Sequence, residues 1–169
     1  MTTVCAPVSG RVLPLRGAPD PTFAAEMVGS GVAIDPDLPA AGAGAAVGAG
    51  AAVGAGAFAL APISGRLTKV FPHAFVITGT GTGELAILVH LGIDTIALKG
   101  EGFEIIAAEG SDVDAGDPVI SWDPADVAER GLSPIVLVCV LGSRPGAVDP
   151  GETGRAVAAG ESLFEAPGK

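Results

Sequence analysis

The sequence predicts an all-β protein, an antiparallel β-sandwich built from two similar halves. Most of its 169 residues fall in short runs rich in β-branched side chains, bounded by Gly, Pro, Asp and Ser, and few segments have a helical period. Two pairs of segments also match within the chain: Ala6–Val12 with Ala61–Leu67, and Gly110–Ile120 with Gly154–Phe164. Because both copies of the first type precede both copies of the second, we expect a folded-over duplication rather than a tandem solenoid.

The predicted strands are short and are separated by turn residues. In chain order they are Val4–Pro7, Gly31–Ile34, Gly65–Phe71, Ala74–Thr78, Leu85–Leu91, Phe103–Ala107, Val119–Trp122 and Ile135–Leu141. Two short helices are predicted between them, at Asp20–Gly29 and Asp123–Gly131. Each begins with an aspartate that can cap the helix and a proline at the first helical position, and each ends at a glycine.

An uncharged tract, "AAGAGAAVGAGAAVGAGAFALA", occupies Ala40–Ala61 and is long enough to suggest a membrane-spanning segment. Few of its residues are strongly apolar, no Lys/Arg cluster flanks it, and each glycine would cost a helix roughly 1 kcal/mol. We therefore predict that residues 39–56 form a disordered, low-complexity insertion at the surface, which the fold tolerates because loop-closure entropy grows slowly with length.

The net charge of −10 argues against nucleic acid as a partner, because proteins neutralise its phosphates with Lys and Arg. The N-terminal residues "MTTVCAPVSG" show no signal peptide, so we expect a cytoplasmic protein. Cys5 and Cys139 lack metal or redox spacing, and Cys139 lies in a predicted buried strand. Both are interpreted as structural thiols.

The chain has two histidines, His73 and His90, and both lie in "PHAFVITGTGTGELAILVHLGIDT". The Gly/Thr run in the middle of this segment predicts a hairpin. Centring the turn between Gly81 and Thr82 would place His73 opposite His90, with Cβ atoms about 5 Å apart. A register shifted by one residue would still let the two imidazoles meet across the diagonal.

Residue types alone leave three interpretations of this pair. The rings can be structural, although each has a donor and an acceptor to satisfy. They can bind a metal, with Asp94 as the nearest third ligand, but zinc-hydrolase motifs are absent. They can also take part in phosphoryl transfer, because a neutral imidazole offers a lone pair at physiological pH. A serine hydrolase and a nucleotide-binding loop are poorly supported, since their motifs are missing.

Longer segments of the chain resemble the glucose-type enzyme IIA of the bacterial phosphoenolpyruvate-dependent sugar phosphotransferase system (PTS). The similar segments are "HAF", "LVHLGIDTIALKGEGFE", "APVSGRVLPLRGAPDPTFAAEMVGSGVAIDP", "GSDVDAGDPVISWD" and "GETGRAVAAGESLF". They cover nearly the whole chain apart from the Ala/Gly tract. The resemblance therefore implies that residues 1–169 form a single PTS EIIA type-1 domain, a β-sandwich of the duplicated hybrid motif type.

The resemblance implies a phosphotransferase component that carries phosphate during uptake of glucose or N-acetylglucosamine. His90 would be phosphorylated on Nε2 by the phosphocarrier protein HPr, which requires its Nδ1 proton to be donated to a backbone carbonyl. His73 would hold the phosphoryl group and assist its transfer to a cysteine of the IIB part of the IIB/IIC permease. Asp94 would tune the local charge or act only as a turn residue. No cofactor is implied, apart from a zinc ion that the two histidines could bind with a partner's carboxylate in a regulatory complex.

The resemblance also implies an apolar rim where partner proteins dock. Its residues, matched by position, are Phe23, Met27, Val28, Phe71, Leu88 and Ile96. The acidic chain would suit a basic partner face. Two alternative functions are a zinc-dependent peptidase of similar fold, which needs more His or Asp ligands, and a regulatory protein that docks to transporters or kinases.

Two departures from the family pattern lie on either side of the first histidine. Many members carry two more residues before it, including a threonine, whereas this chain runs "KVFPHAF". A hydroxyl partner for His73 is therefore expected to be missing. The "GTGTG" hairpin that follows is longer by about the same amount.

Overall fold

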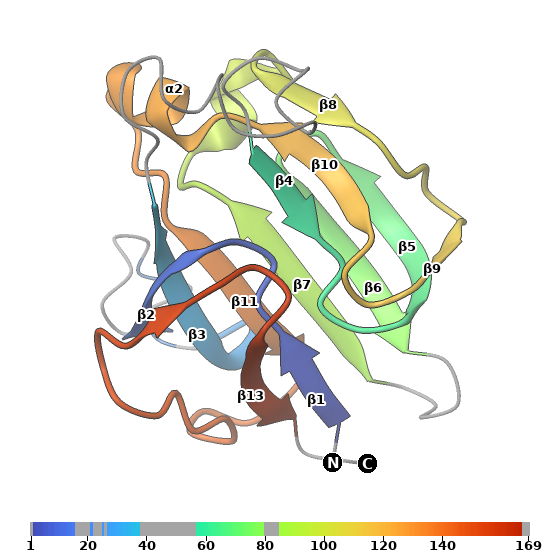
Figure 1. Ribbon diagram of the computed structural model, residues 1–169, viewed down its shortest axis with the longest axis vertical. Helices are drawn as coiled ribbons and strands as arrows, with labels where there is room; N and C mark the ends of the chain where they lie inside the picture. The colour runs from blue at the N-terminus through green and yellow to red at the C-terminus, as the bar shows by residue number, and fades with distance from the viewer. Residues whose placement is uncertain are drawn as a thin grey trace.

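The computed structural model describes residues 2–15, 21, 25, 27–37, 57–79 and 85–166, and nearly all regular structure in them is β (Figure 1). The strands are β1 (Thr2–Cys5), β2 (Gly10–Pro14), β3 (Gly29–Pro36), β4 (Ala57–Leu60), β5 (Gly65–Phe71), β6 (Ala74–Gly79), β7 (Ala86–Leu91), β8 (Phe103–Ile105), β9 (Asp112–Val113), β10 (Pro118–Trp122), β11 (Val136–Leu141), β12 (Ala156–Val157) and β13 (Ser162–Ala166). The helical elements include the 3-10 helix η4 (Thr95–Leu98) and the α-helix α2 (Pro124–Glu129).

These strands form antiparallel sheets of unequal size. The largest has the strand order β12-β2-β3-β11-β7-β6-β5-β9, while β4-β10-β8 and β1-β13 form two smaller sheets. In Figure 1 the smaller sheets lie across one face of the large sheet, and β7 runs toward the end of the molecule at which α2 lies. The predicted all-β antiparallel sandwich is therefore confirmed.

The repeated sequence segments occupy equivalent places in the fold. The first pair leads into β2 and β5, and the second pair forms β12 and β9, which pair with β2 and β5 respectively. The turns match atom for atom, since the Ser9 hydroxyl accepts a hydrogen bond from the Ala159 amide at 2.9 Å and the Ser64 hydroxyl accepts one from the Ala115 amide at 3.0 Å. The duplication predicted from the sequence is thus visible in the hydrogen bonding.

The two halves meet through a reciprocal pair of backbone hydrogen bonds. The Cys5 amide donates to the Pro62 carbonyl at 2.8 Å, and the Leu60 amide donates to the Pro7 carbonyl at 2.9 Å. Pro7 and Pro62 are the same position of the repeated segment. Such an exchange, in which each half makes the same contact with the other, is what two-fold pseudosymmetry requires.

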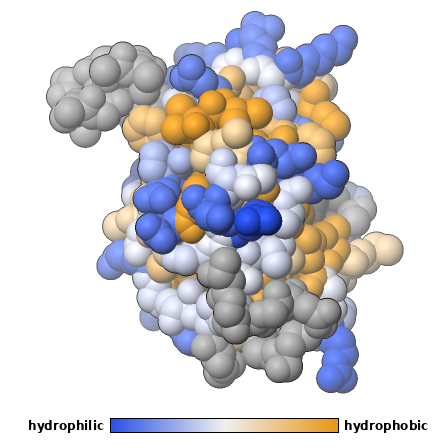
Figure 2. Space-filling model, turned by 90° about the vertical axis from the view of Figure 1, so that its right-hand side faces the viewer, coloured by the Kyte–Doolittle hydropathy of each residue, from blue (hydrophilic) through white to orange (hydrophobic). Residues whose placement is uncertain are grey.

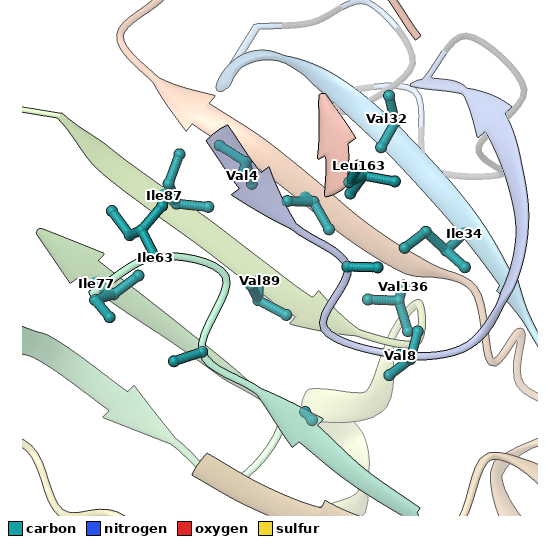
Figure 3. Packing of buried hydrophobic residues seen from close by; sticks show 14 of the residues in the cluster. Val4, Val8, Val32, Ile34, Ile63, Ile77, Ile87, Val89, Val136 and Leu163 are labelled. Atoms are coloured by element: carbon teal, nitrogen blue, oxygen red, sulfur yellow. The ribbon is translucent and has the colours of Figure 1, made fainter. Parts of the chain in front are cut away.

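The core lies between the large sheet and the two smaller ones. Alternate residues of each strand point into it, because side chains along a strand alternate between the two faces. Figure 3 shows such side chains from β1, β3, β6, β7, β11 and β13 converging, among them Val4, Ile34, Ile77, Val89 and Val136. Burying an aliphatic side chain of this kind contributes about 1.5–3 kcal/mol. This cluster holds the sandwich together.

The opposite face of the large sheet carries a second, smaller cluster. Its buried members are Leu15, Ala33, Ile93, Leu137 and Cys139, with the half-buried Leu88 packed against them. Cys139 is fully buried in β11, as expected for a structural thiol, and Cys5 is half-buried. The outer face of the large sheet is therefore apolar beside β7, the strand that carries His90.

The predicted helix at Asp123–Gly131 is confirmed. Asp123 accepts a hydrogen bond from the Ala125 amide at 3.0 Å, Pro124 is the first helical residue, and Gly131 follows the helix with φ of +84°. Most of the other predicted helix, Asp20–Gly29, lies outside the described residues, as does the insertion predicted at 39–56. Within the described ranges, no helix is long and apolar enough to cross a membrane.

Candidate functional site

His73 lies in a tight turn between two strands of the large sheet. β5 and β6 pair with Phe71 opposite Ala74, which leaves Pro72 and His73 as the two residues of the connection. Proline fixes its own φ near −65° and is suited to the first central position of a turn. The short approach to the first histidine is therefore a two-residue turn of Pro72 and His73 that follows the last residue of β5, Phe71, and it places His73 directly before the start of β6.

β6 and β7 pair with Ala74 opposite His90 and Ile77 opposite Ile87. The predicted register, with His73 opposite His90, is wrong by one residue. Residues directly opposite one another share a face of the sheet, and a slip of one residue would move every β7 side chain to the other face. Ile77 and Ile87 are both fully buried, so burial of the apolar set of each strand selects the observed register.

The two imidazoles lie side by side in spite of this shift. Their ring centroids are 5.2 Å apart and their planes are inclined at 72°. The backbone supports this approach, because the Leu91 amide donates a hydrogen bond to the His73 carbonyl at 2.8 Å. The prediction that the rings meet across the diagonal is therefore confirmed.

His90 lies on the outer face of β7, between small and apolar neighbours. Ala74 on β6 and Leu137 on β11 are its cross-strand partners, and both are buried. Its Nδ1 atom is 2.7 Å from the carbonyl oxygen of Gly92. A carbonyl can only accept, so the proton of a neutral His90 ring lies on Nδ1 and Nε2 carries the lone pair.

The turn after His90 is tightly constrained. Gly92 has φ of +80°, a conformation that favours glycine, and its amide donates to the Ile135 carbonyl at 2.9 Å. Asp94 also has a left-handed conformation, with φ of 62°, and precedes η4 without a side-chain cap. Aspartate is one of the few residues that adopt this conformation readily. Asp94 is exposed, so its carboxylate faces solvent at the end of the histidine strand.

The surroundings of His73 favour its neutral form. Burial lowers the pKa of the His73 imidazole below its ordinary value of 6.5, and the neighbouring His90 lowers this pKa further. Both causes penalise the charged ring. His73 is therefore neutral at physiological pH and keeps one N–H group as a donor.

Several of the predicted rim residues are exposed apolar side chains. Phe71, with 50% of its surface exposed, has its ring centroid 6.0 Å from that of His73, while Ile96 in η4 is 69% exposed and Met27 is 76% exposed. Val28 is half-buried, and Phe23 lies outside the described residues.

Leu88 is half-buried on the same face of β7 as His90 and packs on the second cluster. In Figure 2, the hydrophobic surface on the viewed face is divided into separate areas by hydrophilic side chains.

The histidine pair supplies two of the ligands that a zinc ion needs. Among the residues that the structure describes, no group of three His, Cys, Asp or Glu side chains could hold a metal ion. A zinc peptidase requires three protein ligands. That alternative has no ligand set in the described part of the chain, and a zinc ion at the histidines would need a third ligand from outside the described residues.

Sequence reasoning missed three residues that shape this site. Gly92 supplies the carbonyl at His90, Thr95 lies buried behind it, and Pro72 forms the turn before His73. A glycine directly after a strand is a signal for a left-handed turn, and a proline before His73 is a signal for a tight one. The buried threonine has no comparable signal, because threonine is ordinarily a surface residue.

Comparisons with known proteins agree with this geometry. The family model described as phosphoenolpyruvate-dependent sugar phosphotransferase system, EIIA 1, matches residues 2–45 and 39–144. The "PTS system glucose-specific EIIA component" of Oceanobacillus iheyensis is 34% identical over 140 residues, which cover 82% of this chain and 73% of that protein. The protein of the same name from Staphylococcus aureus strain N315 is 33% identical over 137 residues, covering 79% and 72%.

A solved structure, glucose permease IIA from Mycoplasma capricolum, superposes with a TM-score of 0.73 at 28% identity and covers 96% of this chain and 93% of that one. The chain therefore belongs to the EIIA 1 family of the phosphoenolpyruvate-dependent sugar phosphotransferase system, and it is a phosphoryl-transferring component of sugar uptake.

Proposed function

We propose that His90 is the residue that carries the phosphoryl group, on Nε2. The observation that supports this assignment is the 2.7 Å contact between His90 Nδ1 and the Gly92 carbonyl. It places the proton on one ring nitrogen and leaves the lone pair on the other. His73, in contrast, has no hydrogen bond from its ring to any described residue, so nothing comparable fixes its tautomer.

The transfer forms one N–P bond and breaks one bond to phosphorus. The His90 Nε2 lone pair attacks the phosphorus of phospho-HPr, and the electrons of the breaking bond return to the donor atom of HPr. The Nδ1 proton stays in place and faces the Gly92 oxygen, which stabilises the positive charge that the ring gains. The second transfer repeats this exchange with a IIB cysteine thiolate as nucleophile, and His90 returns to its neutral form.

His73 holds the phosphoryl group and assists its departure. Its ring centroid lies 5.2 Å from that of His90, close enough for its N–H to reach an oxygen on a phosphoryl group at Nε2. Because burial and His90 lower its pKa, His73 is a neutral donor before the group arrives. The dianionic phosphoryl group then favours the charged ring and strengthens the hydrogen bond.

Asp94 and the apolar rim complete the proposal. The exposed Asp94 carboxylate lies at the end of the histidine strand and tunes the charge at the docking site. Phe71, Ile96 and Met27 are exposed, and Leu88 and Val28 are half-exposed, so HPr and IIB would bury them on docking. A cytoplasmic location is part of the proposal, because the chain would receive its phosphoryl group from HPr and pass it to the IIB part of the permease. Glucose is the proposed sugar, because the curated relatives are named glucose-specific.

Radiolabelled phospho-HPr tests the first assignment. The wild-type chain is expected to take up acid-labile phosphate, and His90→Gln to take up none. Gln keeps a polar side chain of similar size, and circular dichroism would verify that the variant folds. Phosphate uptake by His90→Gln would contradict the assignment.

His73→Gln tests the second assignment in the same assay. We expect it to accept phosphate at a similar level and to donate to a IIB domain much more slowly, because the phosphoryl oxygen loses a hydrogen-bond donor in the transition state. Loss of acceptance with unimpaired folding would make His73 the nucleophile instead.

A further inference from the structure

A buried threonine, Thr95, lies four residues after the end of β7, the strand that carries His90. Thr95 is 1% exposed, and its hydroxyl donates a hydrogen bond of 2.7 Å to the Leu91 carbonyl, four residues earlier. Thr95 is also the first residue of η4, yet its side chain bonds the end of the preceding strand and not the helix. The hydroxyl therefore fixes the chain between His90 and η4.

The backbone of Leu91 connects this hydroxyl to both histidines. Leu91 directly follows His90, its amide donates to the His73 carbonyl at 2.8 Å, and its carbonyl accepts the Thr95 hydroxyl. Rotation of the peptide between Leu91 and Gly92 is thus restrained by the threonine. The next peptide begins at Gly92, whose carbonyl faces His90 Nδ1.

The methyl group of Thr95 restrains Gly92 as well. A Cβ atom placed on Gly92 would come within 2.5 Å of Thr95 Cγ2, within 3.0 Å of the Ser133 carbonyl oxygen and within 3.5 Å of Val127 Cγ1. The α-carbon of Gly92 is therefore enclosed on the side of Thr95. One side chain contacts both the peptide before Gly92 and Gly92 itself.

We propose that Thr95 is a positioning residue for phosphoryl transfer, which acts through Leu91 and Gly92 to hold the Gly92 carbonyl at His90 Nδ1. Its hydroxyl sets which nitrogen of His90 carries the proton and so keeps Nε2 available as the nucleophile. The Thr95 hydroxyl donates to the Leu91 carbonyl and not to an imidazole, so it acts on His90 through the backbone. Its catalytic consequence rests on the proposed role of His90, whereas its effect on the His90 tautomer does not.

Two substitutions separate the hydroxyl from the methyl group. Thr95→Val keeps the shape of threonine and removes the donor, while Thr95→Ser keeps the donor and removes the methyl. Nitrogen-15 NMR of the imidazoles reports the tautomer of each histidine directly. We expect His90 to be protonated on Nδ1 in the wild type and in Thr95→Ser, and to be a mixture of tautomers in Thr95→Val.

Rates of phosphate acceptance from phospho-HPr form the second readout. We expect about a tenfold loss in Thr95→Val, the factor that corresponds to one lost buried hydrogen bond, and at least half of the wild-type rate in Thr95→Ser. If Thr95→Val fails to fold, Thr95→Ala removes the same hydroxyl without adding a methyl in its place, and it carries the same expectation.

The outcomes are distinct. A wild-type tautomer and rate in the folded Thr95→Val protein would overturn the proposal, and so would an equal loss in Thr95→Ser, because the retained hydroxyl would then not suffice to hold the Gly92 carbonyl at His90. If phosphate were found on His73 in the wild type, the proposed function would fail, but the comparison of His90 tautomers would still decide the role of Thr95.

Discussion

His73 titrates in surroundings that oppose its charge. Burial and the neighbouring His90 both lower its pKa from 6.5, so the unfolded chain binds a proton at pH values where the folded chain does not. The stability of the folded chain then increases with pH between the pKa of His73 in the folded chain and its pKa in the unfolded chain. The contribution of His73 to stability is fully present above about pH 7. It is lost as the pH falls through the folded value.

Proton NMR should therefore find the His73 pKa below 6.5. In His90→Gln the pKa should rise part of the way toward 6.5, since the charge of His90 is removed while burial, the larger cause, remains. Denaturant unfolding of the wild type and His73→Gln between about pH 5 and pH 8 provides the matching stability measurement. A wild-type pKa at or above 6.5, or a stability difference independent of pH, would contradict this account.

The residues of the site differ in how well the sequence predicts them. His73 and His90 are the chain's two histidines, and a hairpin between them already implies that they meet. The partner of His90 is a main-chain oxygen, however, and its position depends on the conformation of Gly92. Hydrogen bonds to the backbone leave no pattern in residue types, so the sequence implies a carbonyl partner for His90 but only the folded chain identifies it as that of Gly92.

The strands also differ in how well the sequence predicts their bounds. β5 has the bounds that its composition predicts, and β6, β7 and β11 differ from prediction by a residue at one end. β9 and β12 have two residues each, too few for a periodic pattern, and β4 is formed by the last part of the Ala/Gly tract, directly after the insertion predicted at 39–56. The β6–β7 register was predicted from the centre of the Gly/Thr run, whereas burial of alternate side chains determines it.

Within the turn that joins β7 to η4, Gly92 should be the residue that tolerates substitution least. An alanine there would have φ of +80° and would place its Cβ against Thr95 and the Ser133 carbonyl. We expect Gly92→Ala to lower the free energy of unfolding by about 3 kcal/mol, from backbone strain and crowding together. Phosphate acceptance should fall by more than the loss of folded protein explains, because the Gly92 carbonyl would move away from His90.

Gly142 provides the matched control for this substitution. It has φ of +74°, and a Cβ there would meet nothing within 4 Å. Gly142→Ala should therefore cost only the strain of the left-handed conformation, about 1 kcal/mol, and leave phosphate acceptance unchanged. Equal losses in the two variants, measured by urea unfolding, would show that crowding at Gly92 adds nothing.

For the whole molecule, the duplication is the feature that sequence and structure share most fully. The repeated segments predict two equivalent halves, and the reciprocal bonds between Cys5 and Pro62 and between Leu60 and Pro7 join them. The strand order of the large sheet has the same symmetry, since β3 and β11 occupy the places in one half that β6 and β7 occupy in the other. The chemistry nevertheless lies in one half alone, because both histidines of the chain belong to the segment of β6 and β7 and none to β3 or β11.

The acidic surface leads to a prediction about the rate of docking. The chain has a net charge of −10, and the ion pairs among the described residues occupy only Asp112, Asp126 and Glu101. The remaining carboxylates produce a long-range field that steers a basic partner face toward the site and that salt screens over about 10 Å at 0.1 M. The kcat/KM for phosphate acceptance from phospho-HPr should therefore fall roughly tenfold between about 50 and about 500 mM NaCl.

An uncharged osmolyte at matched osmolarity separates this effect from a change in water activity. The maximal rate at saturating phospho-HPr should change little with salt. At saturation the partners are already bound, so long-range steering no longer contributes to the rate. If kcat/KM were insensitive to NaCl, the negative charge would serve solubility alone, and encounter would depend on the apolar rim around Phe71 and Ile96. A decrease confined to kcat/KM would instead assign steering to the charge of the whole molecule and leave the rim to hold the partner after contact.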